Sequence, residues 1–308
     1  MKKFEFSITD NTTYAGKDLI DFYSKALLSG PSKGTFRVIP GVKSKVNVPR
    51  YDVGSIIKDA SCAWSSTGEG TLSQKQLEAC SKDIQLELCS TTFENNFLSE
   101  YLRAGSNTGE AAPAQFVDYM IGEVGKKVQN DLEIAVWQGD VTGSTYPQNI
   151  CDGVLKIADV DDDVIVATAT VSALTAANVV GQMQIIYNAI PATVISSENL
   201  KFYVSTNVFK LYQQAIANAS SEAYYVGAKE PNFLGIPLLL APGLPAERIV
   251  AADSQNLTLV TDLLSDEEQL SIIPQFDKTG VRTVRIVGNF KFGVNYLVSE
   301  EVVTYNTL

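Results

Sequence analysis

Residues 33–90 contain no apolar run long enough to build a core of their own, although much of the segment is strand-forming. In TFRVIPGVKSKVNVPRYD the strands are interrupted by Pro40-Gly41 and Pro49, and β-rich, polar sequence continues around a glycine-rich turn at 67–70. Proline restricts a strand to a sheet edge or a strand end, and a two-stranded hairpin is marginally stable alone in water. We therefore expect an extended hairpin that needs another surface to lie on.

The clearest helix of the chain spans residues 113–138. Pro113 stands at its start and Gly139 follows its end, as is typical of helix boundaries. One apolar stripe steps along it by three or four residues: Val117, Ile121, Val124, Val128, Leu132 and Ala135. At about 1.5 Å per residue this helix would be about 39 Å long. Gly122 and Gly125 inside it indicate close backbone packing or a bend.

Shorter helices are predicted on either side of the hairpin. An amphipathic pattern at 15–29 ends at Gly30-Pro31, and a strand at 83–88 leads into a helical pattern at 93–102.

After residue 150 the sequence becomes a mixture of helix and strand patterns. One helix is expected to be capped by Thr175 and a second by Asn207, with a strand at 200–205 between them. Short strands with Pro/Gly corners follow. The end of the chain alternates apolar residues on one strand face: Phe290, Phe292, Val294, Tyr296 and Val298. Together these patterns predict an α+β fold.

The composition is that of a globular protein. Of 308 residues, 45% are hydrophobic, which is enough for a full core in two or three domains at most. No apolar stretch approaches the roughly 18 residues of a membrane span, and no apolar block follows the two lysines at the start. We expect a cytosolic protein with no membrane association.

Charge is distributed unevenly along the chain. Residues 1–50 carry +5 and the remainder −16, within a net charge of −11. The basic leader could be attracted to the acidic surface of a neighbouring copy or to a nucleic acid, or it could be a solvated surface without a role. The acidic body disfavours general nucleic-acid binding.

The chain has no histidine. Because imidazole is the usual general base and the commonest metal ligand, serine triads, cysteine–histidine pairs and histidine-based zinc sites are excluded. The four cysteines stand at uneven intervals without a CxxC motif: Cys62, Cys80, Cys89 and Cys151. This argues against a structural zinc site and a disulfide framework, so we expect plain buried thiols.

An acidic run at 159–163 invites a calcium interpretation, because Asp159, Asp161 and Asp163 alternate as in a calcium-binding loop. Val164 and Thr170, however, occupy the positions of the required glycine and bidentate acid. A solvated β-turn is therefore favoured.

Three short motifs match, in order, the SxxK, SxN and KTG triplet of penicillin-recognising serine enzymes, whose chemistry needs no histidine. They are Ser55-Ile56-Ile57-Lys58, Ser197-Glu198-Asn199 and Lys278-Thr279-Gly280. The first falls in the proline-broken hairpin instead of a buried helix, so a structural role is favoured. No GxxxxGK[ST] or GxGxxG motif occurs, which disfavours nucleotide chemistry.

The order of elements resembles the Hong Kong 97-type major capsid protein of tailed bacteriophages: a basic arm, a long two-stranded excursion, a long helix, an α/β body and closing strands. The residues that carry the resemblance are FLGIPLLLAPGLP (233–245), NLTLVTDLL (256–264) and TGVRTVRIVGNFKFGVNYLVSEEVVTY (279–305). The last segment looks like this family's return from the axial to the peripheral domain.

The resemblance implies a Hong Kong 97-like capsid fold with five segments. These are an N-terminal arm at 1–32, an extended E-loop at 33–90, a peripheral domain at 91–149 with the spine helix 113–138, an axial domain at 150–285, and return strands to the peripheral domain at 286–308.

The resemblance also implies a structural protein, not an enzyme, with no cofactor and no metal. Its partners would be further copies in hexamers and pentamers, forming the icosahedral shell of a virion that is assembled in the host cytoplasm and encloses double-stranded DNA without sequence-specific binding. A short leader implies a separate scaffolding protein, and a portal is expected. An encapsulin-like compartment on the same fold stays open. Candidate contacts between subunits are Lys43, Lys45, Arg50, Trp64 and Glu69. For Trp64 local packing is an equal alternative, whereas Trp137 is expected in the core.

Overall fold

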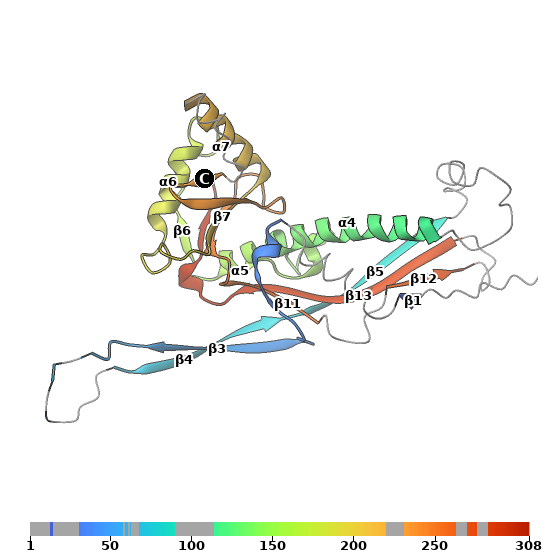
Figure 1. The fold of residues 1–308 in the computed structure, drawn as a ribbon, viewed down its shortest axis with the longest axis horizontal. Helices are drawn as coiled ribbons and strands as arrows, with labels where there is room; N and C mark the ends of the chain where they lie inside the picture. The colour runs from blue at the N-terminus through green and yellow to red at the C-terminus, as the bar shows by residue number, and fades with distance from the viewer. Residues whose placement is uncertain are drawn as a thin grey trace, which may run out of the picture.

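The computed structural model shows an elongated molecule of mixed helix and sheet (Figure 1). It describes residues 13–14, 31–57, 59–60, 62, 68–89, 114–219, 231–262, 270–275 and 283–307. The helices predicted at 15–29 and 93–102 lie outside these residues. Among the described residues, no helix has the length and apolar character needed to cross a membrane.

The helices are α4 (Ala114–Gln138), α5 (Val154–Val160), α6 (Val179–Ala189) and α7 (Thr206–Ala219), with 3-10 turns η1 (Lys33–Thr35), η2 (Gln148–Ile150) and η3 (Ser299–Glu301). The strands are β1 (Thr13–Tyr14), β2 (Arg37–Ile39), β3 (Lys45–Val53), β4 (Gly70–Glu78), β5 (Cys80–Cys89), β6 (Ile165–Ala167), β7 (Leu200–Val204), β8 (Asn232–Phe233), β9 (Ile236–Leu240), β10 (Ile249–Asp253), β11 (Leu257–Thr261), β12 (Leu270–Pro274), β13 (Thr283–Tyr296) and β14 (Val303–Tyr305).

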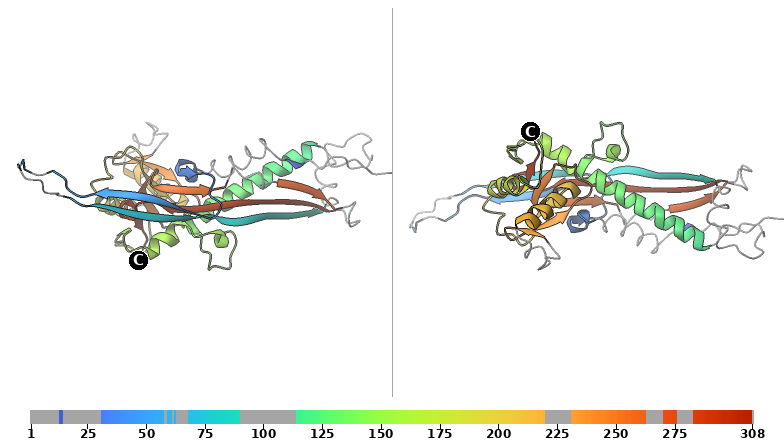
Figure 2. Two further views of the ribbon diagram at one scale, coloured as in Figure 1. Left: turned by 90° about the horizontal axis from the view of Figure 1, so that it is seen from below. Right: turned by 90° about the horizontal axis from the view of Figure 1, so that it is seen from above.

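The first sheet is built on β13, which is 14 residues long. Its order is β1-β12-β13-β11-β2, and β5 also pairs with β13. β5, β13 and α4 extend toward the same end of the molecule (Figure 2). The alternation predicted for β13 is confirmed for Phe290, Phe292, Val294 and Tyr296, which are all buried. They share a core with the C-terminal half of α4, whose predicted extent is confirmed within one residue. Val298, the fifth predicted residue, lies beyond the end of β13 and is half-buried.

The second sheet has the order β6-β14-β10-β7-β9-β8. Side chains along β7 alternate between two cores. Phe202 and Val204 pack with α6 and α7, whereas Tyr203 points to the core that contains the end of α4. Both faces of β7 are therefore covered, which explains why this strand and β10 read as nearly continuous apolar sequence.

Both predicted helix caps in this region are wrong. The helix expected at Thr175 starts at Val179, and the second starts at Thr206. The backbone N–H of Val208 donates to Ser205 Oγ at 3.2 Å, so Ser205 fills the cap position that was assigned to Asn207. A serine directly after a buried strand supplies the cap because the chain turns from β7 into α7 without a loop.

The C-terminal strand β14 joins the second sheet, where it lies between β10 and β6. Residues 286–308 are thus divided between two sheets: β13 in the first and β14 in the second. Val303 and Tyr305 are buried in the core of α6 and α7, and this burial holds the end of the chain in the second sheet.

Candidate assembly surface

Strands β3 and β4 form a separate two-stranded antiparallel sheet that projects from the body (Figures 1 and 2). The pairing runs from Lys45↔Glu78 to Val53↔Gly70. The hairpin points along the long axis, away from the outer end of α4 (Figure 2). The predicted excursion is therefore present, but it is shorter than 33–90, because β5 leaves the hairpin and joins the first sheet.

The distal part of the hairpin exposes large apolar side chains. Tyr51 and Leu72, a cross-strand pair, are each 67% exposed, and Ile57 is 89% exposed. Val53 and Ile56 are exposed beside them. Exposed apolar residues that gather on one element, and are not scattered singly, mark an interaction surface. The described part of the chain does not cover this surface, which we call the hairpin tip: Tyr51, Val53, Ile56, Ile57 and Leu72.

The root of the hairpin is packed against the body. Leu77 is fully buried, in a small cluster with Val42, Ala79 and Val260 of β11. Ala79 N–H donates to Ser44 O at 2.7 Å and closes the root. A Cβ on Gly293 of β13 would lie 1.9 Å from the Glu78 carbonyl oxygen. β13 therefore passes so close beneath the root that only glycine fits there.

Asp161 ties the hairpin to two other segments. Its Oδ2 accepts hydrogen bonds from Lys75 Nζ of β4 at 3.0 Å, and from Tyr296 OH and Ser299 Oγ at 2.8 Å each. Lys75 Nζ also lies 4.7 Å from the centre of the Tyr296 ring, a cation–π contact.

This network sets the ionisation of the carboxylate. Burial alone would raise the pKa of Asp161, but the bonds from Lys75, Ser299 and Tyr296 hold it well below its usual range. The prediction of a solvated turn is thus wrong for Asp161. Asp159 also has a partner, because Arg248 donates to its two oxygens at 3.1 and 2.9 Å.

The predicted contact residues occupy different places on the hairpin. Lys45 pairs with Glu78 at 3.0 Å, and Arg50 lies 3.6 Å from both Asp52 and Glu300. Lys43 and Glu69 are exposed; the Lys43 backbone oxygen accepts from Lys291 Nζ, and that of Glu69 from Gly54 N–H. Trp64 lies outside the described residues. The four described residues do not form one cluster. The apolar residues of the hairpin tip were missed because they are few and are separated by polar residues and glycine, with only Ile56 and Ile57 adjacent.

The start of the 33–90 segment packs into the core of its own chain, so the expectation that this segment needs another surface is wrong for these residues. Phe36 is buried, with its ring 5.7 Å from Trp137 and 5.6 Å from Tyr203. Trp137 Nε1 donates to Ser32 Oγ at 2.9 Å. Trp137 is buried, as predicted. Among the described residues of 33–90, the large apolar side chains that are most exposed are those of the hairpin tip.

Lys33 is fully buried beside these rings. Its Nζ donates to Gln129 O of α4 at 3.0 Å. Burial lowers its pKa from 10.5 to about 8, and the nearby Glu133 carboxylate opposes this shift. Glu133 is buried, and its Oε2 has no hydrogen-bond partner among the described residues. Ser32 and Lys33 are thus joined to α4 by hydrogen bonds from Lys33 Nζ to Gln129 O and from Ser32 Oγ to Glu133 Oε1.

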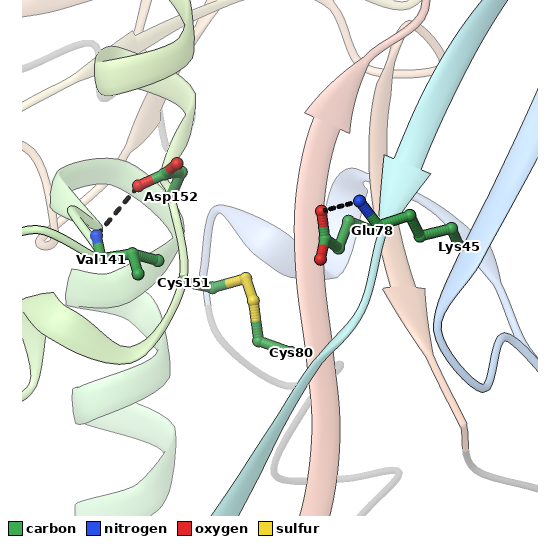
Figure 3. Close-up of a disulfide and its surroundings, with 6 residues drawn as sticks. All are labelled: Lys45, Glu78, Cys80, Val141, Cys151 and Asp152. Carbon is green, nitrogen blue, oxygen red and sulfur yellow. Dashed lines mark hydrogen bonds and ion pairs between the residues drawn. A yellow bond between two sulfur atoms is a disulfide. The ribbon is translucent and has the colours of Figure 1, made fainter.

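The expectation of plain buried thiols is wrong for Cys80 and Cys151, which are bonded to each other, and for Cys62, which is exposed. Cys80 and Cys151 form a disulfide with their Cα atoms 6.0 Å apart (Figure 3). Their separation of 71 residues, without a motif around either, gave no sequence signal for the pairing. Cys62 is a free, exposed cysteine.

The residues of the penicillin-type triplet do not form a site in the described residues. Ser55 is exposed just beyond the end of β3, whereas Ser197 follows α6 and donates to Asp253 at 2.5 Å. Lys58 and the motif at 278–280 lie outside the described residues. In the part of the chain that is described, no group of acidic or cysteine side chains could hold a metal ion.

No protein-family model and no curated protein matches this sequence. Solved structures match it over almost the whole chain. A chain of the satellite phage P4 procapsid including the size determination (Sid) protein has a TM-score of 0.61 and 12% identity, covering 94% of this chain and 98% of that chain. A chain of the capsid of an empty GTA particle has a TM-score of 0.60 and 14% identity, covering 91% and 90%. A chain of the capsid of Myoviridae phage XM1 has a TM-score of 0.55 and 12% identity, covering 89% and 90%.

The chain therefore has the fold of phage capsid proteins. The fold resemblance predicted from the order of elements is confirmed, even though sequence identity to these structures is low.

Proposed function

We propose that this chain is the major capsid protein of a tailed phage, a structural subunit without enzyme activity. Copies assemble into the hexamers and pentamers of an icosahedral virion shell, built in the host cytoplasm around double-stranded DNA. The observation that carries the proposal is the projecting hairpin, whose apolar tip is not covered by the described part of its own chain. The capsid fold supports the same conclusion.

In the shell, the hairpin tip of one subunit lies on a neighbouring subunit. Fully burying one side chain of the size of Leu72 contributes about 1.5–3 kcal/mol. The free energy gained at a single interface of this kind is modest. In a closed shell, however, each subunit forms the interface with a neighbour that is already held in place. The high effective concentration then makes the assembly stable.

The remaining assignments come from the family resemblance. We assign the arm to 1–32, the E-loop to 33–90, the peripheral domain to 91–149, the axial domain to 150–285 and the return strands to 286–308. Within 33–90, β3 and β4 form the projecting hairpin, whereas β5 lies in the first sheet. Lys43 and Glu69 are exposed and are proposed to contact neighbouring subunits, together with Lys45, Arg50 and Trp64. A separate scaffolding protein and a portal complete the proposed set of partners.

The test compares two variants of the full chain by light scattering and electron microscopy. The first carries Tyr51→Ser, Ile57→Ser and Leu72→Ser at the hairpin tip. The control carries Val141→Ser and Val166→Ser, which are also more than half exposed but lie outside strands β3 and β4. We expect the wild-type chain and the control to form large particles or ring-shaped capsomers, and the tip variant to stay small with unchanged circular dichroism.

Two results would contradict the proposal. If the wild-type chain stays monomeric at every concentration, it is not a shell protein. If the tip variant assembles as the control does, the hairpin tip is not needed for assembly. Particles that contain enzyme cargo in place of DNA would favour an encapsulin-like compartment. Covalent labelling of Ser55 by a fluorescent penicillin would favour the serine enzyme.

A further inference from the structure

The disulfide stands at the point where the hairpin meets the body. Cys80 is the first residue of β5 and follows the end of β4 by two residues. Cys151 lies between η2 and α5. Figure 3 shows the bond reaching from the strand that continues the hairpin to the segment that leads into α5. The only covalent link between distant described segments is therefore at the hairpin root.

The short helix α5 is attached on one side to β5, just after the hairpin root, and on the other side to the hairpin strand β4. Cys151, before the helix, is bonded to Cys80, and Asp161, directly after it, holds Lys75 of β4. One attachment is covalent and the other is ionic. The Lys75 and Asp161 side chains keep only 30% and 19% of their exposure, so the ionic attachment is partly shielded from solvent. Of the two, only the covalent attachment can be switched on and off by oxidation and reduction.

We propose that Cys80 and Cys151 form a redox latch that controls the mobility of the hairpin root. With both thiols reduced, the root is still held by the buried cluster around Leu77, by hydrogen bonds and by the Lys75–Asp161 pair, but α5 can reorient relative to it. With the disulfide formed, the root and α5 move as one body. The timing rests on the proposed function: a chain made in a reducing cytoplasm carries the thiols during assembly, and the latch closes after the shell reaches an oxidising medium.

The latch closes by thiol–disulfide exchange with a small-molecule disulfide. Cys80 is half-buried and Cys151 is buried, so the Cys80 thiolate attacks first. It forms a mixed disulfide and expels one small thiol. The Cys151 thiolate then displaces the second small thiol. Two protein thiols are oxidised, their two protons pass to solvent or to the departing thiolates, and one small disulfide is reduced to two thiols.

The experiment is hydrogen exchange on the unassembled full-length chain, so that its outcome does not depend on shell formation. The chain is measured with the latch closed by oxidised glutathione and opened by a thiol reductant. A Cys80→Ser/Cys151→Ser variant reproduces the open state without reductant. A Cys62→Ser variant is the control, because it removes an exposed cysteine that is outside the latch. Amides of β4 and α5 report the root, and those of α6 report the body.

We expect reduction, or the double variant, to speed exchange in β4 and α5 roughly tenfold while α6 is unchanged, as for local opening. The Cys62→Ser chain should respond to reduction as the wild type does. Three results would overturn the latch. One is a thiol count showing that oxidised glutathione does not join Cys80 to Cys151. Another is equal exchange in the two states. The third is an equally large increase in the exchange rate of α6, which would mean that the disulfide stabilises the whole fold and not the root alone.

Discussion

Replacing Lys33 with methionine tests whether this buried lysine carries a charge at neutral pH. Lys33 is fully buried, and burial lowers its pKa from 10.5 to about 8. Below about pH 8 the lysine is protonated in both the folded and the unfolded chain, and the folded state bears the cost of the buried charge. The difference between the two pKa values corresponds to about 3 kcal/mol.

The sign of the pH dependence follows from proton binding. Between about pH 8 and pH 10.5 the unfolded chain binds more protons at this position than the folded chain, so the free energy of unfolding rises with pH. From about pH 7 to about pH 9.5 the wild-type chain should gain about 2 kcal/mol from Lys33. The Lys33→Met variant should lack this gain.

The assay is urea unfolding of the unassembled chain at several pH values, followed by tryptophan fluorescence. Because tyrosines also titrate at alkaline pH, the informative quantity is the difference between wild type and Lys33→Met at each pH. Lys43→Met is the control, since Lys43 is exposed; its curve should run parallel to that of the wild type. A constant difference between the wild type and Lys33→Met from about pH 7 to about pH 9.5 would refute a buried, titrating Lys33.

Two further predictions concern the hairpin root. Asp161→Asn should lower the free energy of unfolding by about 2 kcal/mol, because a carboxylate that accepts four hydrogen bonds, three of them at Oδ2, is lost. In the wild type, acidification to about pH 3 should leave the network intact, because the pKa of Asp161 is far below its usual range. Hydrogen exchange of β4 measures both effects, and rapid β4 exchange at about pH 3 would contradict the second. Gly293→Ala should destabilise the fold by about 2 kcal/mol or more, since its Cβ would meet the Glu78 carbonyl. The control Gly181→Ala, in open space on α6, should stabilise the fold by about 0.5–1 kcal/mol. Thermal unfolding that finds Gly293→Ala more stable than Gly181→Ala would disprove the close approach.

Much of the fold was predictable from periodicity. The 3.6-residue stripe placed α4 within one residue of its observed start, and the alternation at Phe290–Tyr296 identified the buried face of β13. These signals are local, because apolar residues recur at a fixed spacing along a single helix or strand. Helix caps were less predictable. For α7, Asn207 is chemically as suitable as Ser205, and Ser205 is the cap because β7 ends directly before it.

The candidate assembly surface was predictable in outline only. Proline and the shortage of apolar sequence identified a projecting hairpin, and charged residues such as Lys45 and Arg50 were its natural contact candidates. In the structure these two have acidic partners in their own chain, and large apolar side chains are exposed at the hairpin tip. Which side of a two-stranded ribbon stays uncovered depends on how its root is packed, and this does not appear in the sequence of the tip.

The amino-acid sequence alone determined the type and order of the elements, the absence of imidazole chemistry and the existence of a segment too poor in apolar residues to fold by itself. Only the tertiary structure decided the Cys80–Cys151 pairing, the Asp161 network and the burial of Lys33. The physical reason is the separation along the chain of the residues that interact. Periodicity and composition act between neighbours in the chain, whereas these contacts join residues 71 to 138 positions apart, and their partners are chosen by how the two sheets and α4 pack.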